Sequence, residues 1–225
     1  MDNSEMPISR VTRSKQAAQA TYNRISRWYD WLEGNWEGKP KRIALEKLRV
    51  EDGERVLEIG FGTGHALLAL ARSVGAAGKV YGIDLAEGMI EVTAARLKRA
   101  GLEGRVELRH GDAEHLPYDA ETFDAVFSSF VLELFDTPQI PRVLTECRRV
   151  LKRGGRIGIV SLSKAGKPSL LRDGYEWGHA HFENFLDCRP IYVQRALEQV
   201  GFRISDATLM SLWGLPVELV IGLKE

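Results

Sequence analysis

The feature that most constrains the fold is an apolar run leading directly into three closely spaced glycines, Val56–Gly64 (VLEIGFGTG). Such a run is typical of a buried strand that turns sharply into a helix, and glycines let the backbone approach a ligand closely. The spacing differs from a dinucleotide-binding fingerprint, because Gly64 follows Gly62 by two residues rather than three. Taken alone, the loop is consistent with a ligand site or with a structural turn.

Strand-like and helical patterns alternate along the chain after this point. Short apolar runs predict five strands, Arg55–Ile59, Val80–Asp84, Val106–His110, Phe123–Ser128 and Arg156–Ser161. Apolar residues at helical spacing predict the helices Ala66–Val74, Gly88–Ala100, Ile140–Leu151 and Tyr192–Val200. The alternation indicates an α/β fold with a parallel sheet covered on both faces.

Both ends of the chain depart from this alternation. Lys15–Leu48 predicts an N-terminal helical cap, and Phe202–Leu209 with Val217–Leu223 predicts an antiparallel hairpin at the sheet edge. The stretch Lys164–Arg189 has no clear period and is long for a plain connection, so we expect it to cover the substrate. These elements predict a single domain over residues 1–225 with a seven-stranded, mostly parallel sheet.

Composition and charge exclude some function classes. The 225 residues include 31 Lys plus Arg and 31 Asp plus Glu, so the formal net charge is zero. A neutral chain without a long basic run lacks the electrostatic footprint of a nucleic-acid-binding protein. Cys147 and Cys188 lie far apart and show no metal-ligand spacing, so we expect reduced thiols and no metal.

The sequence also bears on location and partners. No stretch is apolar and long enough to span a bilayer, and Asp2, Glu5 and Arg10 stand where a signal peptide would begin. We therefore expect a cytoplasmic protein that acts on a small-molecule substrate, with peripheral membrane contact left open. The residues carry no signal for an oligomeric state.

Acidic residues follow or end three consecutive predicted strands. Glu58 precedes the glycine loop, where a carboxylate repels a pyrophosphate but suits a ligand with an ammonium and a sulfonium. Asp84 ends the second strand, where a carboxylate can accept hydrogen bonds from ribose hydroxyls. Asp112 follows the third strand. Each acid alone could be a solvated turn residue or a cap, but together they predict a ligand site at the carboxyl edge of the sheet.

The ordered set of motifs resembles that of the class I S-adenosylmethionine (SAM)-dependent methyltransferases. The matching segments are Glu58–Gly64, Asp84, Gly111–Ala113, Phe123–Val126 and Leu151–Arg156. The resemblance implies a Rossmann-like, doubly wound sheet and SAM as the cofactor. It implies that the glycines wrap the methionine part of SAM. It also implies that Asp84 holds the ribose and that Asp112 binds the adenine amino group. The implied cofactor-binding residues within this region are Glu58, Gly60, Phe61, Gly62, Thr63, Gly64, Asp84, Leu85, Met89, Gly111, Asp112, Ala113, Ser128 and Ser129.

Within that class, the chain is most similar to the UbiE/COQ5-like group (methyltransferase domain 11/25), which C-methylates quinone precursors. Tyr22–Asp30 carries this likeness, and bacterial phospholipid N-methyltransferases look similar there too. The resemblance implies that Tyr22 and Tyr29 contact the cofactor, with cation–π attraction to the sulfonium. The chain departs from the quinone enzymes at Phe130–Phe135, so the acceptor stays open between a quinone precursor, a phospholipid or small amine, and another hydrophobic small molecule.

Methyl transfer from a sulfonium is an in-line displacement that needs alignment and exclusion of water, and a base only if the nucleophile must lose a proton. The candidate catalytic residues are Glu133, Tyr175 and His179. Glu133 is either such a base or an exposed helix acid, and His179 is either a base or a solvated loop histidine. Aromatic residues that could line an apolar acceptor pocket are Trp177, Phe182, Phe185 and Trp213.

Three rival functions predict features that the sequence lacks or leaves unexplained. A short-chain NAD-dependent dehydrogenase needs the wider glycine spacing and a Tyr followed four residues later by Lys, and no such pair occurs. A nucleic-acid methyltransferase acting on amines or on cytosine carries a Pro-Pro-aromatic run or a Pro-Cys pair, and neither occurs. A non-catalytic SAM-binding protein would leave the long Lys164–Arg189 stretch without a role.

Overall fold

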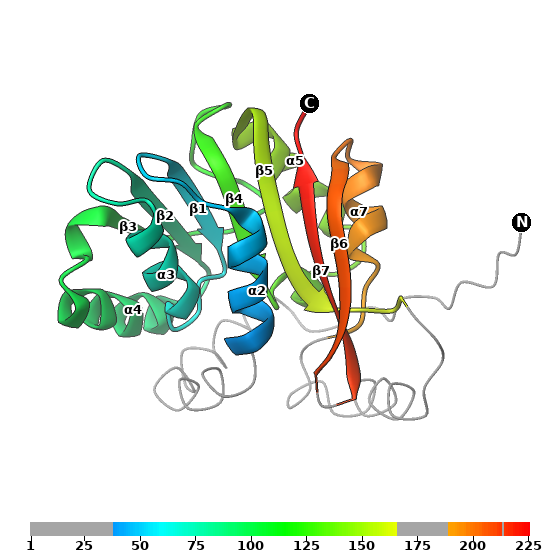
Figure 1. The fold of residues 1–225 in the computed structure, drawn as a ribbon, viewed down its shortest axis with the longest axis horizontal. Coiled ribbons are helices and arrows are strands. Elements are labelled where there is room, and N and C mark those ends of the chain that lie inside the picture. Colours follow the sequence, from blue (N-terminus) through cyan, green and yellow to red (C-terminus); the bar gives the residue numbers. More distant parts are fainter. Residues whose placement is uncertain (1–37, 166–188, 213) are drawn as a thin grey trace, which may run out of the picture.

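The computed structural model describes residues 38–165, 189–212 and 214–225, and these form one twisted sheet with helices on both faces (Figure 1). The strands are β1 Arg55–Ile59, β2 Lys79–Asp84, β3 Val106–His110, β4 Phe123–Ser129, β5 Leu151–Leu162, β6 Arg203–Leu212 and β7 Leu215–Leu223. The helices are α2 Gly38–Leu48, α3 His65–Ser73, α4 Glu87–Ala100, α5 Ile140–Val150 and α7 Val193–Gln199, with the 3-10 turns η1 Glu103–Arg105 and η2 Leu132–Leu134. Within these described ranges, no helix is both long and apolar enough to cross a bilayer.

The strand order β3-β2-β1-β4-β5-β7-β6 confirms the predicted α/β, Rossmann-like, doubly wound sheet. Strands β1 to β5 are parallel to one another, whereas β7 runs antiparallel between β5 and β6 and forms the predicted C-terminal hairpin. The chain order reverses between β1 and β4, which is the place where open α/β sheets bind ligands. Of the predicted N-terminal helical cap, the described part is α2.

One strand boundary differs clearly from the prediction. We expected the fifth strand to begin at Arg156, but β5 begins at Leu151, which pairs with Phe123. The glycines in between do not end the pairing, because Gly154 donates to Lys224 O and Lys224 donates to Gly155 O at the end of the neighbouring strand. The last turn of α5 therefore passes directly into the sheet.

The core lies in two layers, one on each face of the sheet. Alternate residues of a strand point to opposite faces. Val56 accordingly packs in the layer beneath α2, α3 and α4, and its neighbour Leu57 packs in the layer beneath α5 and α7. Both layers consist of buried apolar side chains.

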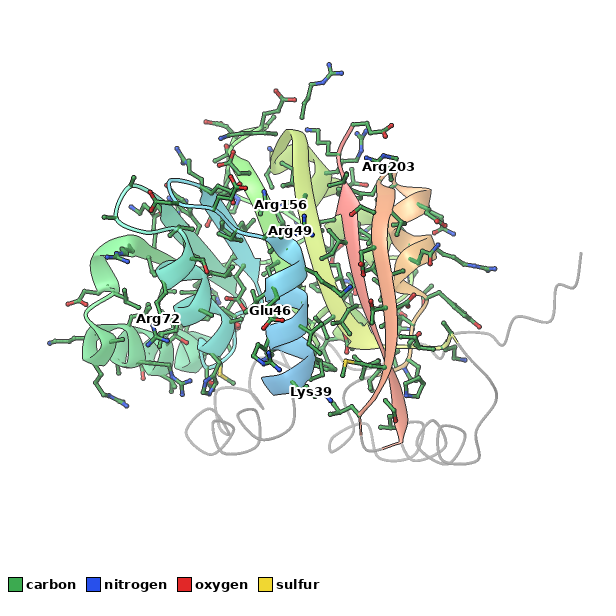
Figure 2. The ribbon with its side chains drawn as sticks, viewed as in Figure 1. Lys39, Glu46, Arg49, Arg72, Arg156 and Arg203 are labelled. Carbon is green, nitrogen blue, oxygen red and sulfur yellow. The ribbon has the colours of Figure 1, made fainter. Side chains whose placement is uncertain are left out.

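Arg156 fastens α2 to the sheet at the amino ends of the strands. Its guanidinium donates to Leu48 O and Arg49 O, the last carbonyls around the end of α2, and forms an ion pair with Glu54. Arg49 and Arg156 lie together in Figure 2, and Arg156 is only 17% exposed. The side chain therefore satisfies carbonyl groups that a helix end leaves without partners in the helix itself.

Replacing Arg156 with Met should lower the free energy of unfolding by about 2–4 kcal/mol, because the helix-end carbonyls and a partly buried Glu54 lose their partner. Arg203→Met is the matched control. Arg203 pairs with Glu225 at the surface, with 56% and 69% of the two side chains exposed, so its loss should cost less than about 1 kcal/mol. Urea denaturation measures both values, and equal stability of the two variants would contradict the role of Arg156.

Candidate functional site

The glycine loop after β1, the turn after β2 and the segment after β4 meet at the carboxyl edge of the sheet. Gly60 N donates to Ile83 O at 2.8 Å, which joins the glycine loop to β2. Gly111 N donates to Asp84 O at 3.0 Å, which joins the turn after β3 to the same strand. The structure thus brings together the loop and the acidic strand ends that the sequence analysis predicted to be neighbours.

Gly60 is required where it stands for two physical reasons. Its φ of 64° lies in the left-handed region, which residues with a Cβ rarely adopt. A Cβ at this position would also collide with the side chain of Val131, which follows β4. The backbone of Gly60 therefore packs directly against the side chain of Val131.

The Asp84 carboxylate connects two turns. Its Oδ2 accepts a hydrogen bond from Gly62 N at 3.0 Å, and its Oδ1 accepts one from Ala86 N at 2.9 Å. Asp84 is half-buried at the sheet edge. An acid predicted as a ribose ligand is therefore also the residue that orients the glycine loop.

The other two strand-end acids differ in exposure. Glu58 is 3% exposed within β1, and its backbone lies in register with Gly82 and Phe127. Asp112 is half-buried, and its Oδ1 accepts from Glu114 N at 3.0 Å, which forms a tight turn after β3. All three acids thus lie at or just after the carboxyl ends of β1, β2 and β3, with Glu58 buried and Asp84 and Asp112 half-buried.

Glu133 is fully buried, so the alternative of an exposed helix acid is wrong. It lies in η2, and its Oε1 accepts a hydrogen bond from Leu162 N, the last residue of β5, at 3.3 Å. Phe130 directly after β4 has a φ of 56°, an uncommon conformation for a residue with a side chain. After this turn the chain places the Glu133 carboxylate in the interior of the protein.

A buried arginine holds the same segment from the other side. Arg189, where the described chain resumes, is fully buried; its guanidinium donates to Phe135 O and, at 3.1 Å, to Thr137 Oγ1. Nearby, Lys164 N donates to Ile191 O and Ile191 N donates to Leu162 O, both at 3.0 Å. Lys164, the first residue of the predicted substrate cover, and Ile191, just beyond its last residue, are therefore held beside the end of β5.

Several predicted site residues pack tightly within the protein. Phe61 and Met89 are each 2% exposed and belong to the core layer under α3 and α4. Ser128 and Ser129 are the last two residues of β4. Ser128 Oγ donates to Ile59 O at 3.2 Å, while the buried Ser129 Oγ has no hydrogen-bond partner within the described chain. The remaining predicted cofactor residues, Thr63, Leu85 and Ala113, lie at the same edge, and Leu85 is half-buried.

Other predicted residues lie outside the described part of the chain. These are the cofactor candidates Tyr22 and Tyr29, the catalytic candidates Tyr175 and His179, and the aromatic candidates Trp177, Phe182, Phe185 and Trp213. Most of the predicted substrate cover lies outside it as well. Their roles stay predictions.

Thr93 on α4 was not among the residues predicted from the sequence to belong to the site. Thr93 Oγ1 donates to Gly62 O at 2.9 Å, although 31 residues separate the two in the chain. The one available signal was a polar residue on the apolar stripe of a predicted helix, between Met89 and Leu97. The position of a threonine on a helix does not reveal which distant backbone group its hydroxyl will bind.

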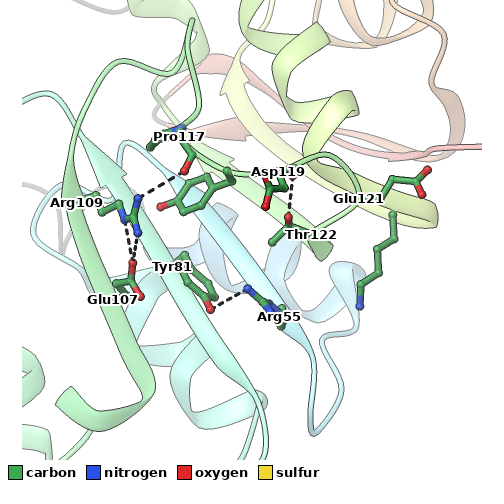
Figure 3. A pocket seen from close by; sticks show the side chains of 10 residues that line it. Arg55, Tyr81, Glu107, Arg109, Pro117, Asp119, Glu121 and Thr122 are labelled. Carbon is green, nitrogen blue, oxygen red and sulfur yellow. Dashed lines mark hydrogen bonds and ion pairs between the residues drawn. The ribbon is translucent and has the colours of Figure 1, made fainter.

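A separate hollow of about 580 Å³ lies at the opposite edge, among residues from the amino ends of the strands (Figure 3). Arg55 Nη2 donates to Tyr81 Oη at 3.0 Å, and Arg109 pairs with Glu107 at 2.8 Å. Tyr81 also packs edge-to-face against Tyr118. The hollow therefore lies apart from the carboxyl edge, where open α/β sheets bind their ligands.

The chain is similar to known methyltransferases. A family model described as a methyltransferase domain matches residues 56–155. A demethylmenaquinone methyltransferase of Lactobacillus johnsonii is 33% identical over 169 residues, which cover 73% of this chain and 68% of that relative. A phosphatidylethanolamine N-methyltransferase of Cereibacter sphaeroides is 32% identical over 192 residues, which cover 84% of this chain and 90% of that relative. Among solved structures, a SAM-dependent methyltransferase from Aquifex aeolicus has a TM-score of 0.62 and 23% identity, covering 82% of this chain and 89% of that one.

Tyr118 yields a prediction about stability at high pH. Burial raises the pKa of Tyr118 from 10.0 to about 12, so the folded state keeps a proton that the unfolded state has lost. The free energy of unfolding should therefore fall as the pH rises from about 10 to about 12, by less than about 1.4 kcal/mol per pH unit because the ring is only half-buried.

The Tyr118→Phe variant isolates this contribution. It should reduce the fall in stability over the same pH range, and it should cost little at neutral pH because Tyr118 Oη is buried without a hydrogen-bond partner in the described residues. Urea denaturation of both proteins between pH 8 and pH 11.5 measures the difference. Parallel curves across the range would show that Tyr118 titrates normally.

Proposed function

The chain belongs to the class I SAM-dependent methyltransferases, close to the UbiE/COQ5 group, and we propose that it methylates a small, hydrophobic acceptor of the quinone-precursor kind. The observation that carries the cofactor part of the proposal is the Asp84 carboxylate at the end of β2, which accepts from Gly62 N, while Gly111 N donates to the backbone oxygen of Asp84. It puts a hydrogen-bond acceptor next to the glycine loop that follows β1, and the strand order reverses between β1 and β4.

The residues of this edge fit SAM. In the proposal, Gly60–Gly64 hold the methionine part, Asp84 the ribose and Asp112 the adenine amino group. The left-handed backbone of Gly60, with a φ of 64°, supports the first assignment, because it turns the loop sharply at the end of β1. The buried Ser129 Oγ, without a hydrogen-bond partner in the described residues, supports a polar contact at the end of β4.

Bound SAM supplies an activated methyl group on a positively charged sulfur. The protein's part is to align the acceptor with that group and to exclude water. The acidic edge formed by Glu58, Asp84 and Asp112 attracts the cationic cofactor. Apolar side chains after β4, among them the buried Phe130 and Leu132, keep the neighbourhood of the reaction dry.

The acceptor assignment rests on the relatives, and a second candidate has its own observation. The demethylmenaquinone methyltransferase relative favours a quinone precursor. The buried carboxylate of Glu133, together with the phosphatidylethanolamine N-methyltransferase relative, favours a phospholipid or small amine. An ammonium group must lose a proton before its nitrogen can attack a methyl group, and Glu133 is the described residue that we propose accepts it.

Calorimetric titration with SAM and, in parallel, with NAD tests the cofactor, and transfer of labelled methyl groups to demethylmenaquinone or phosphatidylethanolamine tests the acceptor. We expect saturable binding of SAM and none of NAD. Label in the quinone supports the main proposal, and label in the phospholipid supports the second candidate. Binding of NAD without binding of SAM would overturn the cofactor site.

Asp84→Ala should weaken SAM binding by about 2–4 kcal/mol, because the variant loses the ribose contacts and the bonds that orient the glycine loop. Asp119→Ala is the control, since Asp119 is an exposed acid beside the hollow at the opposite edge. Calorimetry should give wild-type affinity for the control. Unchanged affinity in Asp84→Ala would remove the ribose assignment.

Glu133→Gln keeps the oxygen that accepts from Leu162 N but removes the basic carboxylate. We expect single-turnover rates to fall by a factor of about 10²–10⁴ while SAM affinity stays the same. Glu146→Gln is the matched control, because Glu146 also accepts a backbone hydrogen bond, from Leu116 N at 2.9 Å, but on α5. If Glu133→Gln and the control turn over alike, Glu133 is a structural acid.

A further inference from the structure

Thr93 has an unusual environment for a threonine within a helix. It lies on α4 between Met89 and Leu97, on the stripe that faces the core, and its side chain is fully buried. A helical threonine commonly returns its hydroxyl to a carbonyl one turn earlier in its own helix. Thr145 on α5 does so, with Oγ1 donating to Pro141 O at 2.7 Å. Thr93 instead donates to Gly62 O in the glycine loop, at 2.9 Å.

The hydroxyl of Thr93 completes the fixation of Gly62. The N–H of Gly62 donates to Asp84 Oδ2 at 3.0 Å, and its carbonyl accepts from Thr93 Oγ1. Both polar backbone groups of the middle glycine are therefore held by side chains from outside the loop, one at the end of β2 and one on α4. Each hydrogen bond of this kind contributes about 0.5–1.5 kcal/mol in typical proteins.

The methyl group of Thr93 makes a second contact, with the next glycine. A Cβ on Gly64 would lie 2.5 Å from Thr93 Cγ2 and 2.8 Å from its Oγ1, closer than atoms can pack. Gly64 also has a φ of 82° as it starts α3. Thr93 thus occupies the space where a side chain on Gly64 would lie. One residue therefore contacts both Gly62 and Gly64.

We propose that Thr93 is a positioning residue that preorganises the glycine loop for the cofactor without touching the cofactor itself. The inference rests on the proposed assignment of this loop to SAM. A loop already held in its binding conformation loses less conformational freedom when a ligand binds, which increases affinity. Thr93 therefore governs cofactor affinity, whereas the rate at saturating SAM depends on other residues.

The test compares Thr93→Val, Thr93→Ser and the control Thr145→Val. Val preserves the shape of Thr but leaves Gly62 O without its donor, and Ser keeps the hydroxyl. Calorimetric titration with S-adenosylhomocysteine should give a dissociation constant about tenfold higher for Thr93→Val and within about threefold of wild type for Thr93→Ser. Thr145→Val should bind as wild type does. In steady-state assays the KM for SAM should rise in Thr93→Val while kcat stays unchanged.

Hydrogen exchange of the cofactor-free proteins gives an independent readout. Amides of Gly60–Gly64 should exchange about tenfold faster in Thr93→Val than in wild type, with no change in α7. Wild-type affinity and wild-type exchange in Thr93→Val would overturn the proposal. If that variant does not fold, a Thr93→Ser protein with tenfold weaker binding would overturn it equally. If wild type binds neither SAM nor S-adenosylhomocysteine, the proposed function fails, while the exchange rates still decide whether Thr93 holds the loop.

Discussion

The rest of the site depends on the Asp84 carboxylate, which accepts hydrogen bonds from Gly62 N and Ala86 N at the end of β2. A glycine loop is free to adopt many conformations, so something outside the loop must choose one. Asp84 does this from β2, and Thr93 assists from α4. Residues of β2 and α4 thereby fix the conformation of the glycine loop between β1 and α3.

The segment after β4 is organised by a different interaction, burial of charged side chains. Glu133 is enclosed under the end of β5, and Arg189 is enclosed beside Phe135 and Thr137. Buried ionic groups are costly unless backbone or side-chain partners compensate them. Such groups are retained where they carry out chemistry or fix a conformation, and this segment borders the edge where SAM is proposed to bind.

Much of the fold could be predicted from local patterns. The five parallel strands, the helices between them and the C-terminal hairpin follow from periodicity and glycine positions, and β1 has the predicted bounds. The start of β5 at Leu151 could not be predicted, because its pairing depends on Lys224, more than sixty residues later. The burial of Glu133 escaped prediction for a similar reason, since the turn at Phe130 depends on packing and not on a turn-forming residue.

The sequence by itself determined the alternating fold, the glycine loop with its non-dinucleotide spacing, and the order of acids at the strand ends, because each depends on residues close together in the chain. Only the tertiary structure decided that Asp84 and Thr93 hold Gly62 from two sides, that Val131 crowds Gly60, and that Glu133 lies inside. Those contacts join residues that are 22 to 71 positions apart, and no local pattern encodes a partner at such a distance. The physical reason is that hydrogen bonds and close packing depend on proximity in space, which exists only after the sheet has brought its strand ends together.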